Sequence, residues 1–115
     1  MYQLEDLAAW RKARELRQHV SVVCKSFSKE ERYRLIDQLI RASRSILANI
    51  AEGHGRFHYQ ENIQYSRQAR GSLVECLDHF YVALDETFID KHQFTQFKAK
   101  YDELLRILNG NIAYL

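Results

Sequence analysis

Residue types that bind metals or carry out acid–base chemistry are present, but their spacing does not fit helical metal sites. Glu15 and His19 are four residues apart, as are Glu75 and His79, whereas a di-iron helix bundle needs Glu-x-x-His pairs on facing helices. Cys76 and His79 could supply two zinc ligands, but a structural zinc site needs four. The sequence therefore predicts no metal and no cofactor.

A ribonuclease is the one enzyme class that the spacing of polar residues leaves open. Arg14 and His19 match the R-x4-H spacing of the HEPN ribonucleases, which are also small helical bundles. In such a site the arginine would stabilise phosphate charge and the histidine would transfer a proton. However, residues five apart lie about 140° apart around a regular helix, so the two side chains do not converge without an irregularity. We keep this reading as the alternative to a non-catalytic protein.

Arginines cluster around one predicted turn and could bind phosphate. Five of them flank the turn that follows the central helix: Arg41, Arg44, Arg56, Arg67 and Arg70. Arginine suits bidentate contacts to phosphate, so this group is the candidate site for RNA or DNA. An equally open interpretation is that these arginines are solvated or form ion pairs, since Glu52 would neutralise part of the charge.

Length and composition predict one helical domain, residues 1–115. The chain has 115 residues, no proline and four glycines, and 46% of its residues are hydrophobic. Residues 1–56 hold 11 Lys or Arg against 7 Asp or Glu, whereas residues 57–115 hold 6 against 8. Positive charge is thus concentrated in the first half. The absence of an apolar run of about 20 residues excludes a membrane-spanning helix and predicts a cytoplasmic protein, in which Cys24 and Cys76 are reduced core residues.

The segment that positions these groups is a helix with two distinct faces. Apolar residues recur every three or four positions, as in an amphipathic helix: Ile36, Leu39, Ile40, Ile46, Leu47 and Ile50. A second stripe, which we call the second face, combines charged residues with small ones: Arg34, Gln38, Arg41, Ser45, Asn49 and Glu52, with Ala48 beside them. Small residues allow close approach of another helix, so we predict that this helix is covered on both sides.

Self-association follows from that prediction. The residues expected in a subunit interface are Arg41, Ser45, Ala48, Asn49, Glu52 and Arg70. Arg70 falls within an apolar arc of the next predicted helix, where an unpaired charge is costly. Glu52 and Glu75 are the candidate partners, and we expect Glu52, across the turn, to be the one that pairs with Arg70.

The glycines Gly53 and Gly55 predict the end of the central helix. A glycine after the last helical turn adopts the left-handed conformation without a steric penalty. A phosphate-binding P-loop is excluded, because it requires GxxxxGK[ST] after a strand and neither is present.

Caps and periodicity predict the remaining boundaries. A first helix should begin near Asp6, with an apolar face from Ala9 to Phe27. Ser28-Lys29-Glu30-Glu31 has the form of a capping box, so the central helix should run from Ser28 to Glu52. A third helix is expected over Tyr59–Thr87.

The last helix should have Asp90 as its N-cap. Its apolar stripe continues beyond Asn109-Gly110 to Leu115, which predicts that the helix does not stop at Gly110. Four amphipathic helices with short connections predict an all-α, antiparallel, up-down-up-down four-helix bundle.

The central motif QLIRASRSILANIAEGHGR, residues 38–56, resembles the signature of bacterial four-helix-bundle proteins encoded in intervening sequences of 23S rRNA genes. Three other stretches agree with that family: Asp6-Leu7 with Trp10 and Ala13, FSKEERYRLIDQ (27–38) and ARGSLVE (69–75). The resemblance spans Asp6 to Glu75, and the last third agrees only as an amphipathic helix. The family is similar to the accessory variability determinant of diversity-generating retroelements, a basic pentamer that binds nucleic acid and a reverse transcriptase.

This resemblance implies a ring-shaped homo-oligomer, a pentamer. In a ring, each basic residue is repeated once per subunit and the positive potential is reinforced. The resulting hypothesis is a non-catalytic oligomer that binds RNA or DNA through a basic surface. The alternative is a purely structural module, or one that binds an unidentified protein partner.

Overall fold

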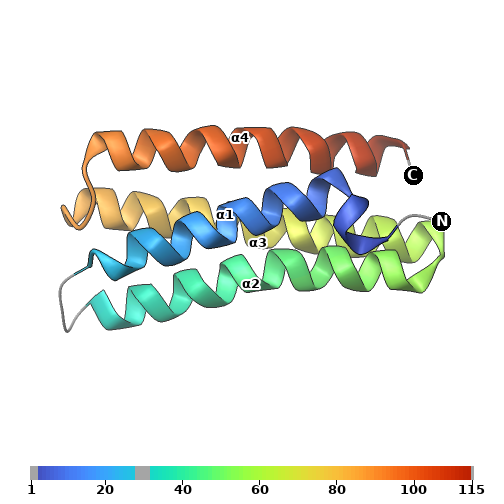
Figure 1. Ribbon diagram of the computed structural model, residues 1–115, viewed down its shortest axis with the longest axis horizontal. Helices are drawn as coiled ribbons and strands as arrows, with labels where there is room; N and C mark the ends of the chain where they lie inside the picture. Colours follow the sequence, from blue (N-terminus) through green and yellow to red (C-terminus); the bar gives the residue numbers. More distant parts are fainter. Residues whose placement is uncertain (1–2, 28–31, 115) are drawn as a thin grey trace.

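The computed structural model describes residues 3–27 and 32–114 and contains helices only in this part of the chain. The elements are a 3₁₀ turn η1 (Leu4–Asp6) and the helices α1 (Ala8–Lys25), α2 (Arg32–Arg56), α3 (Tyr59–Asp85) and α4 (Lys91–Tyr114). Successive helices run in opposite directions, and both ends of the chain lie at the same end of the bundle (Figure 1). Each helix packs against two neighbours, in the cyclic order α1, α2, α3, α4. The predicted all-α up-down-up-down bundle is therefore observed within one chain.

The start of α1 differs from the prediction. Asp6 ends the short η1 turn, where its carboxylate accepts a hydrogen bond from the Gln3 amide at 3.0 Å. Helix α1 begins only at Ala8, after an extended Leu7 that provides no side-chain cap. Asp6 therefore closes the preceding turn instead of capping α1. The apolar face is as predicted, since Ala9, Ala13, Leu16, Val20, Val23 and Phe27 are all buried.

Helix α2 continues through both glycines, so the prediction that it ends at Gly53 is wrong. It runs to Arg56, and neither glycine has a positive φ. A Cβ on Gly53 would lie 3.0 Å from Asn62 Oδ1 and 3.0 Å from the Cβ of Tyr65. Gly53 is therefore needed for the close approach of α2 and α3, not for a helix cap. The predicted capping box at Ser28–Glu31 lies outside the described residues.

The turn between α2 and α3 consists of two residues. Phe57 has φ 59°, the left-handed conformation that glycine usually adopts at this position. His58 is extended and precedes the first residue of α3. Phe57 is also 77% exposed, so this turn presents an aromatic ring to solvent.

Asp90 caps α4 as predicted. Its carboxylate accepts from the Gln93 amide at 2.8 Å, and the Gln93 side chain accepts from the Asp90 amide at 3.0 Å. Helix α3 ends at Asp85, two residues before the predicted Thr87, which has φ 59°. Helix α4 continues through Asn109 and Gly110 to Tyr114, which confirms that Gly110 is not a stop.

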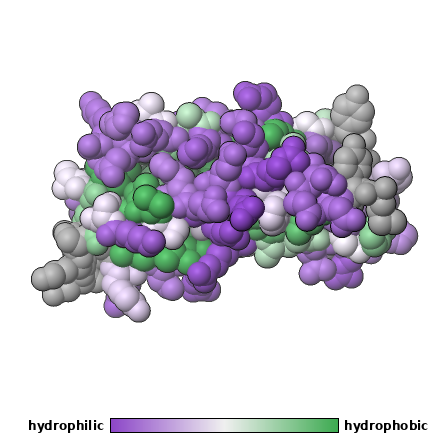
Figure 2. Space-filling view, viewed as in Figure 1, coloured by the Kyte–Doolittle hydropathy of each residue, from purple (hydrophilic) through white to green (hydrophobic). Residues whose placement is uncertain are grey.

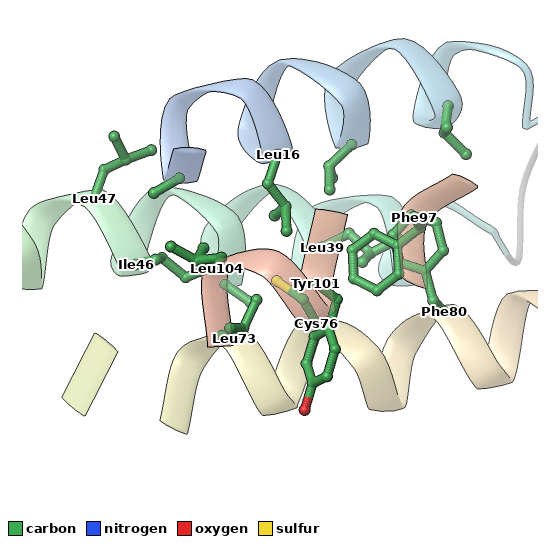
Figure 3. Close-up of a cluster of buried hydrophobic side chains, with 14 of the residues drawn as sticks. Leu16, Leu39, Ile46, Leu47, Leu73, Cys76, Phe80, Phe97, Tyr101 and Leu104 are labelled. Atoms are coloured by element: carbon green, nitrogen blue, oxygen red, sulfur yellow. The ribbon is translucent and has the colours of Figure 1, made fainter. Parts of the chain in front are cut away.

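The core is a column of apolar side chains from all four helices (Figure 3). Leu16, Leu39, Leu73 and Leu104, one from each helix, are fully buried. Phe80 and Phe97 stack with their ring centroids 3.7 Å apart. This column extends along a bundle of 44 × 22 × 20 Å.

Both cysteines are buried within this core, as predicted. Burial raises the pKa of Cys24 to about 11 and that of Cys76 to about 12. Neither thiol is therefore a nucleophile at neutral pH. Among the described helices, none is long and apolar enough to cross a membrane.

Candidate functional site

The five arginines of the predicted phosphate site do not share one surface of a single chain. Arg44 lies in the groove between α1 and α2, whereas the guanidinium of Arg70 donates to Asn109 Oδ1 on α4 at 2.8 Å. Arg44 also lines a depression with Arg41 of α2 and Glu75 of α3, whereas Arg70 is bonded to α4, so these two arginines do not share a contact surface. Arg67 is exposed on α3, and Arg41 is exposed on α2 with Asp37 3.8 Å away.

Arg56 is surrounded by acceptors at the end of α2. Its Nε lies 3.2 Å from Glu52 Oε2 and 3.8 Å from Glu61 Oε2, and its Nη2 donates to the Tyr65 hydroxyl at 3.3 Å. The electrostatic interaction with the Tyr65 hydroxyl, then that with Glu52, raises the pKa of Arg56. Two carboxylates thus neutralise the charge of this arginine.

The expected ion pair between Arg70 and Glu52 is not formed. Arg70 bonds to Asn109 and Glu52 pairs with Arg56. The ion pair does not form because the Arg70 side chain extends toward α4, whereas Glu52 lies on α2. The half-buried Arg70 has a polar partner, as expected, because an unpaired charge there is costly. The prediction placed that partner on α2, whereas the structure places it on α4.

The second face of α2 is only partly open. Ser45 Oγ lies 3.0 Å from Ser72 Oγ of α3, and the Asn49 amide donates to the Ser45 carbonyl oxygen at 2.9 Å. Ser45 thus serves the contact between α2 and α3 within one chain, and Asn49 is bonded to Ser45 on its own helix. Arg41, Ala48 and Glu52 remain exposed along one strip of α2.

Instead, the structure brings together a basic groove between α1 and α2. It has a volume of about 260 Å³ and is lined by Arg17, Gln18, Ser21, Ile40, Ser43 and Arg44. We call these residues, with the adjacent Arg14, the α1–α2 groove. Arg14 lies one helical turn before Arg17 and Gln18, with its guanidinium 5.7 Å from the centroid of the half-buried Trp10 ring.

The arginines of the α1–α2 groove have no acidic partner among the described residues. No carboxylate oxygen there lies within 4.0 Å of the Arg14, Arg17 or Arg44 guanidinium. Sequence reasoning missed Arg17 because its proximity to Arg44 depends on how α1 and α2 are aligned. The one feature of the sequence that could have indicated this proximity is that Arg17 and Arg44 each lie at the margin of the apolar stripe of their helix.

Charge is distributed unequally among the helices. Helix α1 carries five Lys or Arg and one acidic residue, α2 carries five Arg and two acidic residues, and α3 carries two Arg and four acidic residues. The view in Figure 2 looks onto α1 with α2 and α4 on either side, and the most hydrophilic side chains gather over its middle. The α1–α2 side is therefore the more positive side of the bundle.

The geometry does not support a joint role for Arg14 and His19. Arg14 lies against Trp10, whereas His19 lies in a depression of α1 and α4 with Gln96, Lys100 and Glu103. The Nε2 atom of His19 is buried and has no hydrogen-bond partner among the described residues. Burial, and then the positive charge of Lys100, lowers the pKa of His19. The two side chains of the ribonuclease alternative thus occupy different sides of α1.

His19 should make the protein less stable at mildly acidic pH. Because its pKa is lowered in the folded state, the unfolded chain takes up a proton more readily as pH falls below about 6.5. We expect wild type to lose stability relative to His19→Gln between pH 7.5 and pH 5, measured as the midpoint of urea unfolding. A constant difference between the two proteins over this range would show that His19 protonates equally in both states.

Metal ligands do not converge in the described part of the chain. Residues 3–27 and 32–114 contain no group of three or more His, Cys, Asp or Glu side chains that could hold a metal ion. Cys76 points into the core, and His79 Nε2 lies 3.1 Å from Glu75 Oε2 on its own helix.

Comparisons with known proteins identify relatives of this chain. Residues 5–110 match the family model described as 23S rRNA-intervening sequence protein, so the similarity extends through most of α4, beyond Glu75. A crystal structure of a protein of unknown function from the S23 ribosomal protein family of Bacteroides thetaiotaomicron VPI-5482 has a TM-score of 0.84 and 19% sequence identity. The alignment covers 91% of this chain and 98% of that one, and it shows the same fold. No curated protein matches the chain.

Proposed function

Since the chain belongs to the 23S rRNA-intervening sequence protein family, and since its positive charge is concentrated on α1 and α2, we propose that it is a non-catalytic protein that binds RNA or DNA. The α1–α2 groove is the contact surface in this proposal. The observation that carries it is the set of three arginines, Arg14, Arg17 and Arg44, that lack an acidic partner among the described residues.

The groove offers the chemistry that a phosphate backbone requires. Arg17 and Arg44 approach it from two helices, and Gln18 and Ser21 add neutral donors beside them. Guanidinium groups bind phosphate oxygens in a bidentate manner. These contacts do not read bases, so binding should be independent of sequence and sensitive to salt.

Self-association would extend this surface. Family resemblance implies a ring-shaped homo-oligomer, and the exposed Arg41, Ala48 and Glu52 strip of α2 is the proposed subunit contact. An arginine and a glutamate on the same strip can pair with their equivalents in a neighbouring copy. Repeating the groove in each subunit would raise the local positive potential.

A protein-binding module is the second candidate, because the α2–α3 turn exposes two aromatic side chains. Phe57 and Tyr59 are 77% and 73% exposed, next to an Arg56 whose charge Glu52 and Glu61 offset. Exposed aromatic residues of this kind are typical anchors in protein interfaces. Under this alternative, Phe57→Ser abolishes partner binding and leaves RNA affinity unchanged.

Nucleic-acid binding is tested with a variant in which two groove arginines are replaced by glutamate. Arg17→Glu with Arg44→Glu should weaken affinity for a single-stranded RNA at least tenfold, because two phosphate contacts are lost. The slope of log affinity against log salt should fall by about one unit per lost contact. Fluorescence anisotropy at two salt concentrations measures both quantities.

The matched control is Arg67→Glu with Arg106→Glu. Both residues are exposed on α3 and α4, so the net charge changes equally while the groove stays intact. Equal losses in the two double variants would show that only overall charge matters, and unchanged affinity in the groove variant would remove the proposal. Light scattering tests the oligomer separately: a monomer at all concentrations would exclude the ring.

A further inference from the structure

A second cavity lies at the end of the bundle that contains both chain termini. It has a volume of about 300 Å³ and opens where the first residues of α1 and α3 meet the last turns of α2 and α4. This volume is at the small end of the range for ligand sites in proteins. The cavity is separate from the α1–α2 groove, with which it shares no lining residue.

One part of the cavity wall is apolar, and its large side chains come from α2, α4 and the segment before α1. The apolar side chains that line it are Leu7, Ile50, Ile107 and Leu108. Ile50 and Leu108 also belong to the buried core. The floor of the cavity is thus formed by Ile50 and Leu108, at the end of the hydrophobic column.

The rest of the wall carries polar side chains: His54, Asn62, Ser66 and Asn111. Ser66 Oγ donates to Asn62 Oδ1 over a long 3.4 Å. The His54 ring contacts the Phe57 ring, but neither His54 nor Asn111 forms a side-chain hydrogen bond with any described residue. Gly53 places Asn62 here, because any larger residue at Gly53 would collide with Asn62 Oδ1.

Among the described residues that line the cavity, none carries an acidic or strongly basic side chain. An ionic ligand would therefore place its charge against the apolar wall without gaining a counter-charge from these residues, which is unfavourable. Amide side chains, by contrast, offer one donor and one acceptor side by side. This donor–acceptor pair is complementary to the cis-amide or amidine edge of a nitrogen heterocycle.

We propose that this cavity binds a small, neutral nitrogen heterocycle of about the size of a nucleobase. Its ring lies against Ile50 and Leu7, and its polar edge meets the amides of Asn62 and Asn111. The proposal does not depend on nucleic-acid binding in the α1–α2 groove, because it uses different residues and no charge.

The probes are adenine and uracil as neutral heterocycles, toluene as an apolar molecule without a polar edge, and benzoate as a charged one. Titration of the full chain, followed by calorimetry and by NMR shifts of the Asn side-chain amides, should show saturable binding of a heterocycle. Affinity should be unchanged between low and high salt, unlike that of RNA. Absence of heterocycle binding, or equal affinity for toluene or benzoate, would overturn the proposal.

Two asparagines of α4 provide a matched pair of variants. Asn111→Ala removes a polar group of the cavity and should weaken heterocycle binding about tenfold, as expected for one lost hydrogen bond with a buried partner. Asn109→Ala removes the same side chain from the α3–α4 seam and should leave affinity within about twofold of wild type.

Asn62→Leu, similar in shape but without an amide, should reduce affinity at least as much as Asn111→Ala. If Asn62→Leu does not fold, the comparison of Asn111→Ala with Asn109→Ala still tests the proposal, because Asn111 is exposed and its truncation should not prevent folding. Equal affinities of Asn111→Ala and Asn109→Ala would show that the Asn111 amide makes no contact and would overturn the assigned polar edge.

Discussion

Replacing Leu39 with alanine should lower the free energy of unfolding by about 2–5 kcal/mol. Leu39 is 0% exposed and lies in the middle of the core column, with Leu16 and Leu73 nearby (Figure 3). The neighbouring side chains come from different helices and cannot all relax into the space. The loss therefore combines the removed apolar contacts with the cavity that remains. Urea denaturation followed by circular dichroism measures it.

Val22→Ala is the control for this measurement. Val22 lies on α1 but is 64% exposed, so its truncation should change the unfolding free energy by no more than about 0.5 kcal/mol. Similar effects of the two substitutions would contradict the assignment of Leu39 to the core.

Alanine at Gly53 and at Gly55 should have effects of opposite sign. Gly53→Ala places a methyl group 3.0 Å from the Cβ of Tyr65, an atom that moves only with the α3 backbone. We expect a loss of about 1–3 kcal/mol from this overpacking. At Gly55 no described residue lies within 4 Å of an added Cβ, so Gly55→Ala should stabilise α2 by no more than about 1 kcal/mol through its higher helix propensity.

Thermal or urea unfolding of both variants measures these changes against the same wild type. Stabilisation by both alanines would mean that α2 and α3 are farther apart than the structure shows. Destabilisation by both would instead indicate that the glycines act through the α2–α3 turn, as the sequence pattern first suggested.

The two glycines also show why the helix end could not be read from the sequence. A glycine after an amphipathic stretch usually marks a C-cap, and Gly53 and Gly55 satisfy that pattern. The same residue type is also required where two helices approach closely, and only the position of Asn62 and Tyr65 on α3 distinguishes the two roles. The left-handed position at the helix end is occupied by Phe57, which no propensity rule would select.

The candidate site was predictable in part. The excess of Lys and Arg in residues 1–56 could be read from the sequence, and these residues form α1 and α2. Arg44 was identified and Arg17 was not, because their proximity depends on the alignment of α1 with α2. Arg70 and Arg56 were grouped with Arg44 along the sequence, yet one bonds to α4 and the other to two glutamates.

The sequence by itself determined the helical class, the buried stripe of each helix, the Asp90 cap and the family signature. These properties are local, because they depend on residues three or four positions apart on one helix. Only the tertiary structure decided the role of Gly53, the partner of Arg70, the α1–α2 groove and the cavity at the end of the bundle. Each of these depends on the distance and alignment between helices, which side chains distant in the sequence set together through packing.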